Sequence, residues 1–149
     1  MLTTTTAHAR LLPAHDAHDY TYFRARLADP DLADAGVAVA FLGAPLLAVP
    51  VRGERRGGYA RFGHVVDALQ ARALLGTVPG FPDLRVCWSP YRDTCHTVVW
   101  GAPAPQWWEG DEVFGRFFGY SDYAIADFLR QRSQTPSSAS SDPRSPAAT

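Results

Sequence analysis

The stretch RVCWSPYRDTCHTVVWG, residues 85–101, holds both cysteines of the chain and two of its four tryptophans. On either side of the polar segment 89–93, residues that suit a sheet interior alternate with their neighbours at the two-residue period of a half-buried strand. Pro90 presets φ, and Ser89 and Asp93 can bond nearby backbone groups, as in a turn. The stretch therefore predicts an antiparallel hairpin at the centre of a sheet.

We place the turn on Tyr91, which makes Cys87 the neighbour of Cys95 across the hairpin. In this register one face carries large apolar side chains and a histidine, namely Leu84, Val86, Trp88, His96, Val98 and Trp100. The two thiols lie on the opposite face because successive strand residues point to opposite sides. We therefore interpret the hairpin chiefly as the structural centre of the sheet.

The composition is that of a chain with a substantial hydrophobic core and little net charge. Of 149 residues, 46% are hydrophobic and 12% aromatic, and the net charge of −1 gives no global attraction to nucleic acid or to an anionic membrane. All 14 basic residues are arginine, a bias that a high-GC genome produces, so the excess does not itself indicate phosphate recognition. No signal peptide is recognisable, and we expect a cytoplasmic protein with reduced thiols and no membrane partner.

The predicted fold class is α+β, in one domain over residues 16–131. We expect a mostly antiparallel sheet of four to five strands built from two hairpins, with helices packed on one face. Residues 1–15 and the Ser/Pro/Ala-rich residues 132–149 are predicted to be a disordered arm and a disordered tail. Besides the central hairpin, the expected elements are a helix at 16–27, strands at 37–42, 46–51 and 59–62, a helix at 64–75, and two helices within 111–132.

The helix predicted at 64–75 carries an apolar stripe that we expect to face the core. The stripe consists of Val65, Val66, Leu69 and Ala73.

The segment RGERRGGYAR, residues 52–61, is the most basic stretch of the chain. Its candidate contacts to an anion or to nucleic acid are Arg52, Arg55, Arg56 and Arg61. Glu54 dilutes the charge, and no Walker-type Gly-Lys-Ser follows. We therefore favour a solvated hairpin loop and keep anion binding as the alternative.

Cys87 and Cys95 form a candidate redox pair, because cross-strand neighbours can be bridged. With His96 they offer three zinc ligands, but a fourth ligand and the C-x-x-C spacing are missing. A cysteine nucleophile lacks a base in this register, and Ser89, Asp93 and His96 lack a nucleophile elbow. We predict no catalytic residue, cofactor or metal, and a zinc- or thiol-dependent enzyme is the third class of function.

Residues 111–132 have the pattern of a helix-turn-helix. The matching apolar and small positions are Phe114, Gly115, Phe118, Gly119, Tyr120, Ile125 and Phe128. Arg130 and Arg132 are its candidate nucleic-acid contacts, whereas Asp122 and Asp127 would face phosphate at an electrostatic cost. A DNA-binding regulator is therefore the alternative function.

The candidate residues for binding a protein partner are Tyr91, Arg92, Trp107 and Trp108. The first two lie at the predicted hairpin tip. The tryptophan pair lies in a Pro-rich connector, where it either forms an exposed patch or packs on the sheet. With no convincing nucleophile, metal or phosphate motif, the preferred function is a small non-enzymatic interaction or regulatory protein of unknown partner.

Three stretches together resemble a known family: RRGGY (55–59), GFPDLRVCWSPYRDTCHTVVWG (80–101) and GRFFGYSDYAIADFL (115–129). This family consists of short actinobacterial proteins that carry a domain of unknown function. The resemblance covers roughly residues 16–131 and agrees with the high-GC bias. It implies no activity, cofactor, partner or site residue.

Overall fold

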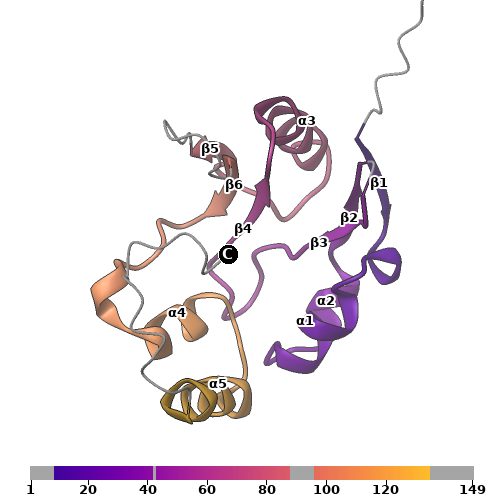
Figure 1. Ribbon diagram of the computed structural model, residues 1–149. Helices are drawn as coiled ribbons and strands as arrows, with labels where there is room; N and C mark the ends of the chain where they lie inside the picture. Colours follow the sequence, from indigo (N-terminus) through magenta and orange to yellow (C-terminus); the bar gives the residue numbers. More distant parts are fainter. Residues whose placement is uncertain (1–8, 42, 88–95, 135–149) are drawn as a thin grey trace, which may run out of the picture.

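A computed structural model describes residues 9–41, 43–87 and 96–134, which form two three-stranded antiparallel sheets with helices around them (Figure 1). The first sheet has the order β1-β2-β3, with β1 at Arg10–Pro13, β2 at Val37–Ala40 and β3 at Leu46–Ala48. The second has the order β4-β6-β5, with β4 at Gly57–Phe62, β5 at Arg85–Cys87 and β6 at His96–Gly101. The α+β class is confirmed, but the strands make two sheets instead of one.

The division into two sheets arises in the connection between β3 and β4. Pro50 follows β3 and has no N–H to donate to a ladder. A tight turn follows, in which the Arg55 backbone N–H donates to the Arg52 carbonyl oxygen at 3.1 Å. The chain thereby leaves the first sheet, and β4 pairs with β6 instead.

Strand β1 corrects the prediction of a disordered arm over residues 1–15. Leu11 lies opposite Val39 and Pro13 opposite Val37, and the chain continues into the short 3-10 helix η1, Ala14–Asp16. Its sequence, RLLP, has two adjacent leucines and no alternation of apolar and polar residues, so it lacks the pattern that reveals a strand. The prediction is wrong for residues 10–15, and residues 1–8 lie outside the described part.

The β5–β6 hairpin forms, in a register two residues away from the predicted one. Val86 lies opposite Val98 and Cys87 opposite Thr97, so the predicted pairing of Cys87 with Cys95 is wrong. The period of a strand is two, so alternation alone fits both registers and a shift of two keeps each side chain on its face. The residues between the strands, 88–95, lie outside the described part.

One hydrophobic core joins both sheets to helix α3, Val65–Leu75. Its buried members are Val39, Ala48, Ala60, Phe62, Ala68, Ala71, Leu75, Phe81, Val98 and Trp100. The stripe predicted for this helix is wrong, because α3 buries its small face through Ala68 and Ala71 while Val66 is 55% exposed. Small side chains let the helix backbone approach the sheet closely.

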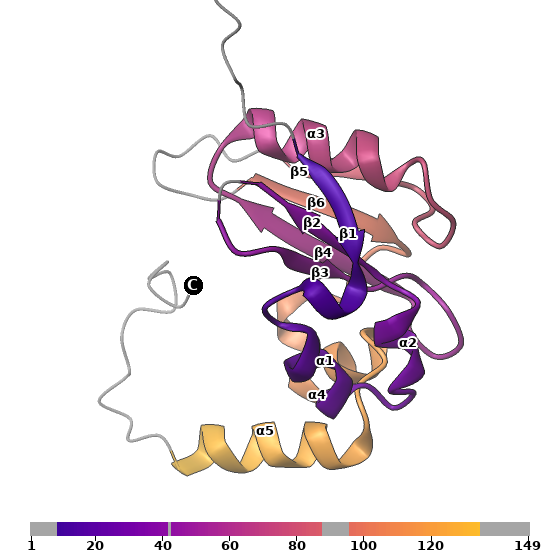
Figure 2. The ribbon, with the colours of Figure 1, turned by 90° about the vertical axis from the view of Figure 1, so that its right-hand side faces the viewer.

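Helices cover more than one face, which corrects the prediction of one covered face. In Figures 1 and 2, α3 lies on one side of the strands and α1 (Tyr20–Arg26) and α2 (Asp31–Asp34) on the other. Ala38 and Leu47 turn away from α3 and pack with Leu32 and Ala33 in a second buried cluster. Helix α1 begins at Tyr20, later than predicted, because residues 14–16 form η1 and the extended backbone of Ala17 separates that turn from α1.

The two C-terminal helices are confirmed and follow the 3-10 helix η2, Trp107–Glu109. Helix α4 spans Asp111–Phe117 and helix α5 spans Asp122–Gln134. Gly119 lies between them at φ +77°, a left-handed conformation that glycine adopts without strain. Because α5 continues to Gln134, the predicted disordered tail is wrong for residues 132–134, and residues 135–149 lie outside the described part.

The turn between α4 and α5 is held to the sheets by Arg55. This side chain is only 4% exposed, so the prediction of a solvated loop is wrong at Arg55. Its Nε donates to the Val49 carbonyl oxygen at 3.2 Å, and its Nη1 donates to the Phe118 carbonyl oxygen at 2.8 Å. Burial lowers the pKa of Arg55 to about 10, so the guanidinium stays charged at neutral pH.

Replacing Arg55 should destabilise the protein markedly. In Arg55→Met the Phe118 carbonyl oxygen loses its donor inside the protein, and we expect the free energy of unfolding to fall by about 3 kcal/mol. The measurement is urea unfolding followed by circular dichroism. Arg56→Met is the matched control, because it removes the same charge from the adjacent, exposed position and should change stability by less than about 0.5 kcal/mol. Equal losses in both variants would contradict the role of Arg55.

Candidate functional site

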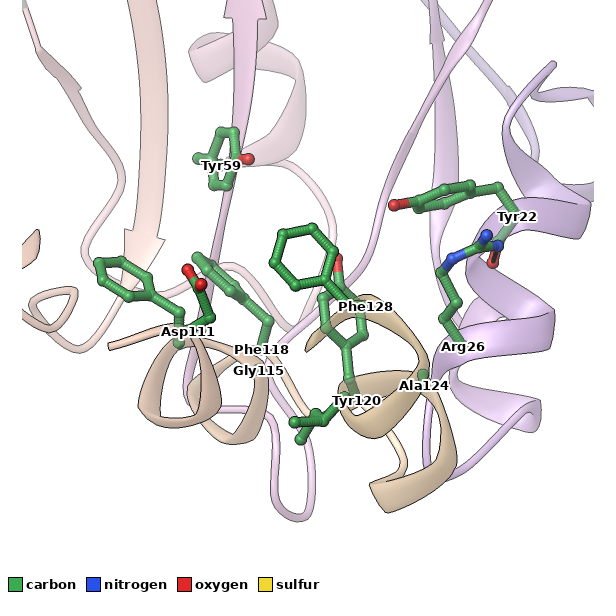
Figure 3. A pocket seen from close by; sticks show the side chains of 11 residues that line it. Tyr22, Arg26, Tyr59, Asp111, Gly115, Phe118, Tyr120, Ala124 and Phe128 are labelled. Carbon is green, nitrogen blue, oxygen red and sulfur yellow. Dashed lines mark hydrogen bonds between the residues drawn. The ribbon is translucent and has the colours of Figure 1, made fainter. Parts of the chain in front are cut away.

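An aromatic pocket of about 240 Å³ lies between α1, β4, α4 and α5 (Figure 3). We call it the aromatic pocket and define it by the residues that line it: Tyr22, Arg26, Tyr59, Asp111, Phe114, Gly115, Phe118, Tyr120, Ala124, Ile125 and Phe128. Six of these are aromatic, and they come from three parts of the chain that are far apart in the sequence: α1, β4 and the segment 111–134 with α4 and α5. The pocket is therefore assembled only by the complete fold.

Two walls of the pocket carry an arginine stacked on a tyrosine. On α1, Tyr22 and Arg26 are one helical turn apart, and the guanidinium carbon lies 3.7 Å from the centre of the Tyr22 ring. On β4, Tyr59 and Arg61 are two residues apart on the exposed face, with 5.3 Å between guanidinium carbon and ring centre. Each pair places a cation against the ring of a tyrosine that lines the pocket.

The floor of the pocket depends on the close approach of α4 and α5. A Cβ at Gly115 would lie 2.6 Å from Cγ1 of Ile125, so only glycine lets the two helices meet at this distance. The Phe118 ring packs edge-on against Tyr59 with 5.5 Å between ring centres. The Arg55 guanidinium lies 5.7 Å from the centre of the same Phe118 ring, at the back of the site.

Three tyrosine hydroxyl groups face the interior of the pocket. Figure 3 shows the hydroxyls of Tyr22, Tyr59 and Tyr120 pointing toward the space between their rings. Burial raises the pKa of Tyr120 to about 12, and the electrostatic effect of Tyr22 and Tyr59 adds to the rise, whereas the positive charge of Arg55 opposes it. The pocket thus combines an apolar aromatic lining with phenol groups, whose hydroxyls can donate and accept hydrogen bonds.

Tyr120 should release its proton at a higher pH than an ordinary tyrosine does. Because the folded-state pKa is about 12, the contribution of Tyr120 to stability is complete below its ordinary value of about 10 and is lost as the pH rises through about 12. An alkaline titration of tyrosinate absorbance should show a component near pH 12 that disappears in Tyr120→Phe. Tyr123→Phe, at a position 74% exposed on the next helix, should retain it. A wild-type titration without this component would contradict the buried environment of Tyr120.

The predicted anion-contact residues are not gathered into one site. Arg52 is exposed and forms an ion pair with Asp29 at 3.4 Å. Arg56 and Arg61 are exposed at opposite ends of β4, separated by about 16 Å of extended chain. Of the four arginines predicted in this stretch, Arg61 lies beside Tyr59 and Arg55 beside Phe118, two residues that line the aromatic pocket.

The two predicted nucleic-acid contacts on α5 form ion pairs within the protein. Arg130 pairs with Asp127 at 3.0 Å, and Arg132 pairs with Asp111. Arg116 on α4 likewise pairs with Glu112 at 3.1 Å.

The remaining predicted residues lie elsewhere. Trp108 is 65% exposed on η2, and Cys87 is an exposed free cysteine. Tyr91, Arg92 and Cys95 lie outside the described residues. Within the described part, no three His, Cys, Asp or Glu side chains come close enough together to hold a metal ion.

Sequence reasoning missed the pocket because its residues were assigned to other roles. The spacing of Phe114, Phe118 and Phe128 predicts the apolar positions of a helix-turn-helix, yet these side chains line the aromatic pocket. The available signal was the density of aromatic residues in 114–128, which exceeds what two short helices need for mutual packing. Tyr22 and Tyr59 carry no such signal, since only the fold brings them to α4 and α5.

The comparisons with known proteins give a family without a function. A family model described as a family of unknown function, DUF6302, matches residues 11–148. The predicted membership in such a family is confirmed, and the match is wider than the expected 16–131; an actinobacterial origin stays a prediction. No curated protein and no solved structure matches the chain. Among the described residues, no helix combines the length and apolar character needed to cross a membrane.

Proposed function

We propose that this chain, which belongs to the DUF6302 family of unknown function, is a non-enzymatic binding protein whose protein partner inserts an apolar side chain into the aromatic pocket. The volume of about 240 Å³ is below the roughly 300–1,000 Å³ of typical small-molecule sites. It suits one large side chain. Partner proteins commonly bind through a few such anchor residues, each seated in a pocket.

The observation that carries this proposal is the clustering of exposed aromatic side chains. Among the described side chains, the exposed large aromatic residues are Tyr22, Tyr59, Trp108, Tyr123 and Phe128. Three of the five line the aromatic pocket, and Tyr123 lines a neighbouring hollow that shares Tyr22, Ala124 and Phe128 with it. Exposed aromatic residues are enriched at protein interfaces because they bury much area at little entropic cost.

The predicted partner contacts outside the pocket remain part of the proposal. Trp108 is exposed and offers a second aromatic contact, whereas Tyr91 and Arg92 lie outside the described residues. The cytoplasmic location is also kept as a prediction.

A neutral anchor probe tests the pocket directly. N-acetyltryptophanamide, titrated in solution and followed by NMR, should shift the amide signals of Tyr120 and Ala124. Phe128→Ala should weaken binding about fivefold, because the ring is 52% exposed at the pocket and its loss removes an aromatic contact. Leu129→Ala is the matched control, since it removes a 39% exposed apolar side chain from the next position of α5.

Two results would count against the proposal. One is a set of shifts scattered over the surface instead of gathered at the pocket. The other is an equal loss of binding in the Phe128 and Leu129 variants.

DNA binding by α4 and α5 is the second candidate function. The observation in its favour is that α5 follows α4 across a short turn and is exposed along most of its length. Against it, residues 111–134 hold four carboxylates and three arginines, and each of these arginines is already engaged by a carboxylate. Phosphate contacts would have to compete with these internal ion pairs.

A mobility-shift assay separates the two functions. If α5 binds DNA, duplex DNA should be shifted at low salt, and the shift should be lost in an Arg130→Ala, Arg132→Ala double variant. Arg72→Ala is the control, because Arg72 is exposed on α3, on the other side of the strands. The absence of a shift at low salt would eliminate the DNA-binding candidate.

A further inference from the structure

Resting on the proposed function, we further propose that the partner is an acidic peptide segment, with Asp or Glu residues beside the apolar anchor, whose carboxylates contact Arg26 and Arg61. The net charge of the whole chain is −1, so this preference comes from the local arrangement of charges around the aromatic pocket. The carboxylates and the arginines around the pocket differ in the partners that they have within the protein.

The carboxylates near the pocket already have partners within the protein. Asp111 lines the pocket and is paired with Arg132. Asp127, on the neighbouring hollow, accepts hydrogen bonds from Arg130 and from Gln131, both at 3.0 Å. The negative charge on the α5 side of the site is therefore largely compensated.

The cations at the rim have aromatic partners instead. Arg26 stacks on Tyr22 and uses one N–H for the Tyr22 carbonyl oxygen at 3.1 Å, and Arg61 stacks on Tyr59. In the described part of the chain, neither forms an ion pair with a carboxylate. A guanidinium has five N–H donors in its plane. An arginine that stacks on a ring therefore still has N–H donors at its edge that can form hydrogen bonds to a carboxylate.

A third positive charge lies behind the pocket. Arg55 is buried beneath the Phe118 ring, and its two hydrogen bonds go to carbonyl oxygens, which carry no net charge. Because the surroundings are poorly solvated, its field is less screened than that of a surface arginine. One arginine thus lines the pocket, and two more lie next to its aromatic lining, Arg61 beside Tyr59 and Arg55 beside Phe118, within a chain that is slightly acidic overall.

A short acidic peptide fits this charge pattern better than a nucleic acid does. The pocket admits one anchor group. Arg26 lines it on α1, and Arg61 on β4 lines two adjoining hollows that share Tyr59 and Phe118 with it. A longer polyanion would extend over α4 and α5, where Arg116 and Arg130 are already paired with carboxylates and offer its phosphates few free cations. We therefore favour a peptide of which only a few residues contact the site.

Two matched peptides test the inference. The probes are acetyl-Glu-Glu-Trp-Glu-Glu-amide and acetyl-Gln-Gln-Trp-Gln-Gln-amide, which share the anchor and differ only in charge. We expect the acidic peptide to bind about tenfold more tightly at low salt, and the difference to shrink as salt screens the contacts. In Arg61→Gln, an exposed position, and in Arg26→Gln, the acidic peptide should lose its advantage while the neutral peptide keeps its affinity. Arg72→Gln on α3 should leave both affinities unchanged.

The outcomes distinguish this inference from the proposed function. Equal affinity for the two peptides would overturn the acidic preference and leave the anchor pocket intact. Binding of neither peptide would overturn both. Tighter binding of single-stranded oligothymidylate than of the acidic peptide, weakened by the same arginine variants, would replace the peptide by a nucleic acid.

Discussion

The buried guanidinium of Arg55 is the interaction on which the arrangement of the C-terminal half depends. Its donors meet the Val49 carbonyl oxygen, beyond the end of the first sheet, and the Phe118 carbonyl oxygen, at the end of α4. The Val49 oxygen also accepts the indole N–H of the fully buried Trp100 at 3.0 Å. One backbone oxygen thus ties the two sheets together, and the same arginine extends this connection to the helices that form the aromatic pocket.

Burying a charge without a carboxylate is costly, and the surrounding residues reduce the cost. Carbonyl oxygens accept its N–H groups, and the Phe118 ring presents its negative face. Gly119 leaves room for the chain to pass, since a Cβ there would lie 2.8 Å from the Cβ of Arg55. Because several neighbouring groups are shaped around one side chain, the position of the α4–α5 turn is strongly specified, and so is the floor of the pocket.

Local pattern predicted the elements better than it predicted their assembly. The two C-terminal helices, α3 and the β2–β3 and β5–β6 hairpins could all be found from periodicity and turn residues. The two-residue error in the hairpin register, and the interpretation of Arg55 as a solvated residue, have a common cause. Both depend on contacts with distant segments. An alternating pattern fits two registers equally well. The residues next to Arg55 in the sequence do not indicate that Phe118 will cover its side chain. The aromatic pocket could not be predicted for the same reason.

The backbone hydrogen bonds between α1 and the α4–α5 turn bear on how the protein is made. The Ala28 N–H donates to the Gly119 carbonyl oxygen, and the Ser121 N–H donates to the Arg26 carbonyl oxygen, each at 2.8 Å. These contacts join segments about 90 residues apart, so they form only after a long loop closes. During synthesis, α1 and β4 leave the ribosome well before the helices that complete the site, and their aromatic side chains stay uncovered until then. The aromatic pocket is therefore completed late, only after α4 and α5 have been added to the chain.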